Sequence, residues 1–167
     1  MSPKSKTHPL QTLNRIFIVL HRSLAMYLAD AAPWTAFGHH TARERLNNLV
    51  ADQRDYARRL SLFLTSRRHT LDQGEFPMTY TDLHDLSLDY LMTELVRHQR
   101  QDVLSIERLV GELSGDPEAR RLAEEVLGNA RGHLELLEEA VAKPEGTAKP
   151  QPPASLESPP SPLKSHV

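Results

Sequence analysis

Apolar side chains recur along this chain at the three- and four-residue spacing of amphipathic helices. In the first such stretch, from Leu10 to about Ala31, they form one stripe made of Leu13, Phe17, Leu20, Leu24 and Tyr27. Pro33 follows and predicts that the helix ends before it, because the residue before a proline avoids helical geometry. A capping-box pattern, Thr41-Ala-Arg-Glu44, predicts that a second helix starts in this region.

Three further helices follow from the same pattern. The inner face of the second helix is expected to carry Leu46, Leu49, Gln53, Tyr56, Leu60, Phe63 and Leu64. The segment from Gly74 to Pro77 predicts a break, and a third helix is expected from about Thr81 to about Leu113. Asp116 as N-cap and Pro117 at the first helical position predict a fourth helix, which runs to about Val141. Four amphipathic helices predict an all-α, four-helix bundle.

The connection between the second and third helices decides the topology. If the second helix ends near Arg67, the next thirteen residues can extend about 40 Å, which is enough to run the length of the bundle. The second and third helices would then be parallel, joined by a crossover. If the second helix continues to Asp72, the connection is too short and an up-down-up-down order follows. Because His69-Thr70-Leu71 and the Gly74–Pro77 segment favour an extended strap, we expect the crossover.

The composition places a boundary after the fourth helix. Seven of the twelve prolines lie between Pro144 and Pro162, among serine, lysine and glutamate. Such a segment buries too little apolar surface to order itself. We therefore expect a flexible N-terminus over residues 1–9, a helical domain over residues 10–142 and a disordered tail over residues 143–167.

Charge and cysteine content narrow the classes of function. The net charge of −2 gives no electrostatic footprint for nucleic acid or an anionic membrane. The longest apolar run near the start, Ile16–Leu20, is too short for a secretory signal or a membrane span. The chain has no cysteine, so thiolate catalysis and cysteine-ligated metal are excluded. These features indicate a soluble, cytoplasmic protein that binds neither nucleic acid nor a membrane.

Polar residues on the predicted inner faces mark the candidate site. His133 lies in the apolar stripe of the fourth helix, while Glu94 and His98 lie one turn apart on the third, with Asp102 continuing the row. The second helix contributes Gln53 and Tyr56. Two arrangements fit these residue types. Glu94, His98 and His133 could hold a single divalent iron, manganese or zinc ion, or the cluster could be a hydrogen-bonded network that includes Tyr56 and Gln53.

At these positions the chain resembles the ferritin-like superfamily, which includes bacterioferritins and rubrerythrins. Leu13-Asn14 with Tyr27 is similar to the first helix of bacterioferritins. Gln53-Arg-Asp-Tyr56-Ala57-x-x-Leu60 lies where the family carries Glu-x-x-His-Ala-x-x-Leu. Leu91-x-x-Glu94-Leu95 is similar to the third-helix glutamate segment, and the run from Val126 to Leu137, with Ala130 and Gly132-His133, is similar to the fourth-helix Glu-x-x-His segment. The resemblance covers residues 10–141 and implies a ferritin-like bundle with a metal site at its centre.

The chain departs from the family at most of the metal ligands. A di-iron site in this fold takes one glutamate from each of two helices and a Glu-x-x-His pair from each of the other two. The resemblance carries these six ligands to Leu20, Gln53, Tyr56, Glu94, Ala130 and His133. Of these six positions, only Glu94 and His133 are residues of the type that binds iron in the family. One carboxylate cannot balance two iron ions, so a ferroxidase is not expected.

Two functions remain open. The one we favour is a ferritin-like protein that has lost most of its di-iron ligands and acts as a non-enzymatic structural or interaction protein, as a homodimer or with another protein partner. The other is a metalloprotein with a mononuclear or weakened site at Glu94, His98 and His133, which would carry out redox or hydrolytic chemistry.

The register of the second helix also has an alternative, with Asp52 and Asp55 inward in place of Gln53 and Tyr56, although periodicity favours Gln53 and Tyr56.

Overall fold

The protein is all-helical, as the hydrophobic pattern predicts. A computed structural model describes residues 8–33, 40–83 and 86–143. Within these ranges the chain forms five α-helices and one short 3₁₀ helix, and no strand. In chain order these are α1 (Pro9–His21), α2 (Leu24–Ala31), α3 (His40–Ser66), η1 (Met78–Leu83), α4 (Leu88–Glu112) and α5 (Pro117–Ala142). Almost all of the predicted tail, and the N-terminal residues 1–7, lie outside the described residues.

The prediction of a single helix from Leu10 to Ala31 is wrong, because the chain breaks between α1 and α2. Ser23 takes an extended conformation, with φ −64° and ψ 158°, and its hydroxyl accepts a hydrogen bond from the Met26 amide as the N-cap of α2. Leu20 and Leu24 are both buried, on either side of the break. The apolar stripe therefore continues across a change of backbone direction, which is why periodicity did not reveal it.

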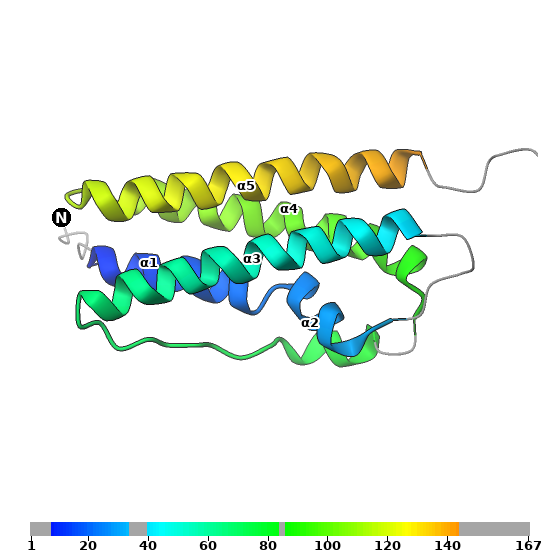
Figure 1. Ribbon diagram of the computed structural model, residues 1–167, viewed down its shortest axis with the longest axis horizontal. Coiled ribbons are helices and arrows are strands. Elements are labelled where there is room, and N and C mark those ends of the chain that lie inside the picture. The colour runs from blue at the N-terminus through cyan, green and yellow to red at the C-terminus, as the bar shows by residue number, and fades with distance from the viewer. Residues whose placement is uncertain (1–7, 34–39, 84–85, 144–167) are drawn as a thin grey trace, which may run out of the picture.

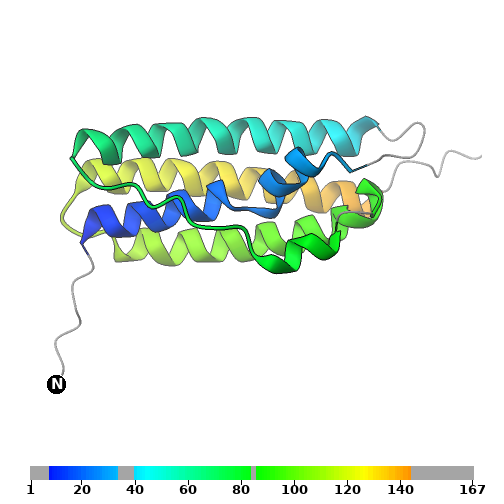
Figure 2. The same cartoon turned by 90° about the horizontal axis from the view of Figure 1, so that it is seen from below.

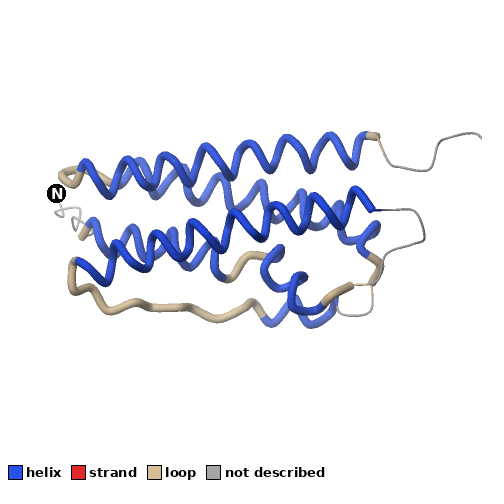
Figure 3. Tube along the Cα trace, viewed as in Figure 1, coloured by secondary structure: helices blue, strands red, loops and turns tan. Residues whose placement is uncertain are grey.

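The long helices lie side by side along one axis of the molecule (Figure 1). α1 and α2 together extend along much of the length that α3, α4 and α5 each span, and the view from below shows the same arrangement (Figure 2). α3 and α4 run in the same direction. Between them, the loop that follows α3 returns along the length of the molecule to η1 (Figure 3).

This returning loop is fixed to α1 by paired hydrogen bonds. The side chain of Asn14, which is 5% exposed, donates to the carbonyl oxygen of Asp72 (3.1 Å) and accepts from the Asp72 amide (3.0 Å). Arg22 Nε donates to the carbonyl oxygens of Gln73 and Gly74, at 2.9 and 3.0 Å, and the Arg22 guanidinium lies 4.7 Å from the centre of the Phe76 ring. The loop is therefore a bound strap with defined partners.

α4 begins later than the sequence predicts. Thr81 and Asp82, the expected start, lie in η1, and the helix begins only after Ser87, whose hydroxyl accepts from the Tyr90 amide. α5 begins as predicted, because the Asp116 carboxylate accepts from the Ala119 amide and Pro117 occupies the first turn. α3 begins at His40, one residue before the predicted Thr41.

Buried apolar side chains form two core clusters along the long axis. The first contains Leu13, Phe17, Leu60, Ile106 and their neighbours. The second contains Leu28, Leu49, Leu91, Leu95 and their neighbours. Among the described residues, no helix combines the length and the apolar character that a bilayer span requires.

Candidate functional site

A layer of buried polar side chains separates the two core clusters. It consists of Ser23, Gln53, Gln99 and His133, which are 2%, 2%, 2% and 9% exposed. Each lies between a residue of the first cluster and a residue of the second: Ser23 between Leu20 and Leu24, Gln53 between Val50 and Ala57, Gln99 between Val96 and Val103, and His133 between Ala130 and Leu137. We call these four residues the polar layer. One comes from the α1–α2 break and one from each of α3, α4 and α5.

The helix break and α3 meet in this layer. Ser23 Oγ donates a hydrogen bond to Gln53 Oε1 at 2.7 Å, and both side chains are buried. The same Ser23 oxygen accepts a hydrogen bond from the Met26 backbone amide. One hydroxyl therefore both caps α2 and donates to the buried side-chain amide of Gln53. The α3 register is the one with Gln53 inward, while Asp55 is exposed.

His133 bonds to α3 rather than to α4. Its Nε2–H donates to Oδ2 of Asp52 at 2.7 Å, and Asn129 Nδ2 donates to the same oxygen at 2.9 Å. These two hydrogen bonds, that of Asn129 first, lower the pKa of Asp52 below its ordinary value, while partial burial acts in the opposite direction. The side chain of Asp52 is 49% exposed, so the ionised carboxylate still reaches water.

Gln99 completes the layer on α4. Its Nε2 donates to the backbone oxygen of Ala130 at 3.1 Å, one turn before His133. Gln99 and Ser23 are not among the site residues that the sequence predicts. A signal for Gln99 exists, because it lies four residues after Leu95 and seven before Ile106 and so shares their helical face.

Glu94 and His98 do not point to His133. Glu94 Oε2 accepts from Nε and Nη2 of Arg97, at 3.0 and 2.6 Å, near the surface of α4. The imidazole of His98 packs edge-on against the ring of Tyr80 from η1, with the ring centres 5.3 Å apart. Burial, with the positive charge of Arg97, lowers the pKa of His98.

Tyr80 and Asp102 form a second pair of titratable groups at this face of α4. Burial raises the pKa of Tyr80 to about 12, with a further contribution from the negative charge of Asp102. Burial also raises the pKa of Asp102 to about 7. At neutral pH this carboxyl group is therefore divided between its protonated and ionised forms.

The remaining positions carried over from the ferritin-like resemblance are packing residues. Leu20 and Ala130 are each 3% exposed and belong to the first core cluster. Tyr56 packs at the edge of the same cluster, and the Arg59 guanidinium lies 4.9 Å from the centre of its ring. None of these three side chains is directed to a common polar site with His133.

The arrangement does not support a metal site. In the part of the chain that the structure describes, no three side chains of His, Cys, Asp or Glu are grouped so that they could hold a metal ion. Of the predicted ligands, Glu94 and His98 both contact Arg97, and His98 also packs against Tyr80, whereas His133 bonds to Asp52 on α3. Each residue of the polar layer makes a hydrogen bond to another group of the protein, which is what buried polar groups in a core require.

Comparison with known proteins adds no family to this description. No family model, curated protein or solved structure matches the chain.

Proposed function

We propose that this chain is a ferritin-like four-helix-bundle protein, with a crossover between α3 and α4, that has lost most of its di-iron ligands and works as a structural or interaction protein. In this proposal α1 and α2 together make the first helix of the bundle. The parallel course of α3 and α4, joined by the strap, supports such a topology. The cytoplasmic location expected from the sequence belongs to the same proposal.

The observation that carries the proposal is the polar layer. It occupies the middle of the molecule, between the two core clusters. Its bonds run from one protein group to another: Ser23 to Gln53, His133 to Asp52, and Gln99 to the Ala130 carbonyl. Such a hydrogen-bonded network holds helices in register, and among the described residues no three side chains of His, Cys, Asp or Glu are grouped to hold a metal ion.

The mononuclear metalloprotein has no observation in its favour. It would require Glu94 to leave Arg97 and His133 to leave Asp52, at hydrogen-bond distances of 2.6 and 2.7 Å. We therefore do not propose redox or hydrolytic chemistry at Glu94, His98 and His133.

Metal analysis of the purified full chain tests the proposal. Protein produced with iron, manganese and zinc in the medium is expected to contain none of them in stoichiometric amount. His133→Ala is expected to have the same metal content as the wild type. Stoichiometric metal in the wild type that disappears in His133→Ala would overturn the proposal, and Glu107→Ala, which changes an exposed residue paired with Arg131, is the control.

A further inference from the structure

The break between α1 and α2 is confined to the backbone of two residues. Helical hydrogen bonding continues to the Arg22 amide, which donates to the Ile18 carbonyl oxygen at 2.9 Å, and it resumes at the Tyr27 amide, which donates to that of Ser23 at 3.2 Å. Ser23 keeps a helical φ of −64°, but its ψ of 158° is far from the α-helical value of about −42°. Arg22 departs less, with φ −115° and ψ 22°. Rotation at these two residues therefore separates the broken segment from one continuous helix.

The local sequence favours the continuous helix. No glycine or proline lies between Leu10 and Ala32, and the residues that follow Ser23 are leucine, alanine and methionine, which are strong helix formers. On a continuous helix, at 100° per residue, five buried apolar residues from both sides of the break would share an arc of about 80°: Leu13, Phe17, Leu20, Leu24 and Leu28. A straight segment could keep this face turned to the core. The break is therefore imposed by contacts with other elements.

The strap contacts the chain on both sides of the break. Before the break, Arg22 donates two hydrogen bonds to strap carbonyl oxygens, and its guanidinium lies 4.7 Å from the centre of the Phe76 ring. After the break, the ring centre of Tyr27 lies 5.5 Å from that of Phe76 and 5.4 Å from that of Tyr80. Phe76 therefore contacts both flanks, and this part of the strap spans the break.

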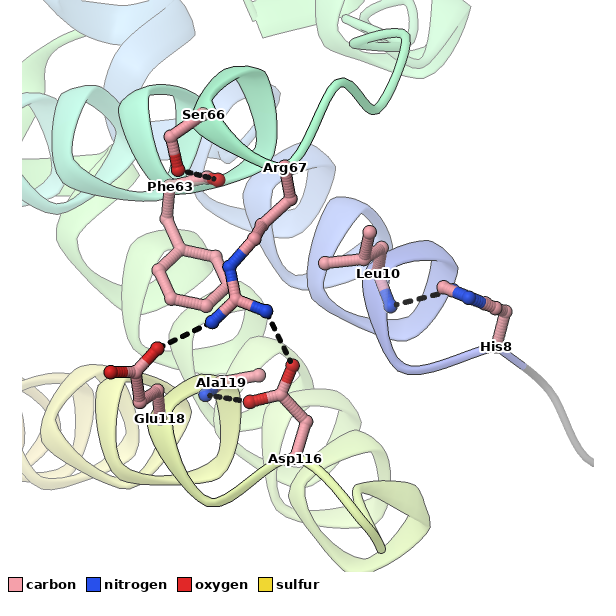
Figure 4. A network of polar contacts seen from close by, with 8 residues as sticks. All are labelled: His8, Leu10, Phe63, Ser66, Arg67, Asp116, Glu118 and Ala119. Carbon is pink, nitrogen blue, oxygen red and sulfur yellow. Dashed lines mark hydrogen bonds and ion pairs between the residues drawn. The ribbon is translucent and has the colours of Figure 1, made fainter.

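The start of the strap is held by different contacts. Arg67, directly after α3, extends over the ring of Phe63 to Glu118 of α5 and to Asp116, the N-cap of α5, whose Oδ2 lies 3.7 Å from Nη1 (Figure 4). These ion pairs join α3 to α5 and do not involve α1 or α2. The start of the strap is therefore anchored independently of the break.

We propose that the break between α1 and α2 is a two-state hinge and that the strap from Gln73 to Tyr80 is its latch. In the latched state Ser23 is extended, caps α2 and donates to Gln53. In the released state Arg22 and Ser23 become helical, and α1 and α2 form a single helix. Release restores helical hydrogen bonds at the break but leaves the Gln53 oxygen without its donor, so the strap contacts decide the balance. The inference concerns a conformational change and does not depend on the proposed function.

Release would change the second core cluster. Met26 belongs to this cluster and is 9% exposed. On a continuous helix it would lie about 160° from Leu24 and would leave the core, whereas Leu24 would stay. The hinge therefore controls whether part of the second core cluster is covered.

Cα chemical shifts of the full chain test the inference, because extended and helical residues deviate from random-coil shifts in opposite directions. We expect an extended shift at Ser23 in the wild type. The release variant Arg22→Ala/Ser23→Ala should show helical shifts at both positions, and amide hydrogen exchange at Leu24 should slow by more than about tenfold. Arg67→Ala/Ser87→Ala is the matched control: it removes an arginine at the start of the strap and the cap of α4, and it should keep the break.

Relaxation dispersion on the wild type provides a second readout that remains valid if the release variant does not fold. A two-state hinge predicts exchange on the microsecond-to-millisecond timescale at Arg22, Ser23 and Met26, towards a minor state with helical Cα shifts. A wild type without such exchange would overturn the inference. So would a folded release variant in which residue 23 stays extended, or a control variant that straightens to the same extent.

Discussion

At the scale of single residues, the ionisation of the buried side chains depends on whether a hydrogen bond offsets the effect of burial. His133 is buried and bonded to Asp52, whose carboxylate remains partly in water. Asp102 is different, since burial raises its pKa and no hydrogen bond from a described residue offsets that effect. It is the carboxyl group for which ionisation should matter most to stability.

Asp102→Asn should make the protein more stable at alkaline pH. Burial raises the pKa of Asp102 from 3.8 to about 7, so the folded state keeps a proton that the unfolded chain has lost. The stabilisation this proton provides is fully present below about pH 4 and is lost as the pH rises through about 7. At about pH 8 the variant should exceed the wild type by about 2 to 4 kcal/mol in free energy of unfolding, measured with urea.

The two proteins should converge near pH 4, and a gap of equal size at both pH values would contradict the assignment. His98 acts with the opposite sign, because burial lowers its pKa in the folded state. Its contribution is present above about pH 6.5 and is lost as the pH falls through the lowered pKa. The pH dependence that His98 contributes is present in both the wild type and Asp102→Asn, so the difference in unfolding free energy between the two proteins does not contain it.

Gly74→Ala should destabilise the protein by about 1 to 3 kcal/mol. Gly74 has φ +60°, and a Cβ atom added there would lie 2.7 Å from Cγ2 of Ile18. Gly132→Ala is the control, since a Cβ atom in that helical position meets nothing within 4 Å and should stabilise by about 0.5 to 1 kcal/mol. Urea midpoints measure both, and a neutral Gly74→Ala would show that the strap does not pack closely on α1.

Sequence reasoning identified buried candidates but not their partners. The stripe of the fourth helix indicated His133, and the stripe of the second indicated Gln53, and both are buried. The partner of His133 depends on how far α3 and α5 are displaced along each other, and periodicity within one helix contains no such information. Periodicity therefore favours Gln53 over Asp52 as the inward residue, although the place of Asp52 at the edge of the stripe is what lets it reach both His133 and water.

At the scale of elements, the break between α1 and α2 stands out because a single serine serves two helices. Ser23 caps α2 and bonds to Gln53 of α3. The break also coincides with Arg22, which holds the strap through Gln73 and Gly74. The bend is therefore fixed on both sides by contacts with other elements.

Ser23→Ala should reduce the free energy of unfolding by about 2 to 4 kcal/mol, as the sum of a lost helix cap and a buried Gln53 oxygen without its donor. Ser87→Ala, which removes the more exposed cap of α4, is the comparison and should lose only about 1 kcal/mol. In a double-mutant cycle, Gln53→Leu should be less destabilising in the Ser23→Ala background than alone. Equal losses for the two serine variants would contradict the shared role of Ser23.

The long helices were predictable because each carries its own local signals. Asp116 and Pro117 marked the start of α5 within the sequence itself. The start of α4 was placed too early, because the segment near Thr81 forms a 3₁₀ turn that positions Tyr80 against the second core cluster. That choice is made by packing against other helices, which local propensity does not contain.

At the scale of the whole molecule, two apolar cores lie on either side of the polar layer. The hydrophobic pattern predicts that helices bury one face, but it treats the core as continuous. The separation into two clusters appears only when Ser23, Gln53, Gln99 and His133 from different elements are placed at one level. We propose that these residues, each hydrogen-bonded within the protein, hold the fold without a metal ion.

Urea unfolding of the wild type in chelator and in excess zinc, manganese or ferrous iron measures whether the stability of the fold depends on a metal ion. A ligand that binds only the folded state stabilises it by about 2.7 kcal/mol at a hundred times its dissociation constant. We expect unfolding midpoints that are the same with and without metal. A midpoint that rises with metal in the wild type and does not rise in His133→Ala would contradict it.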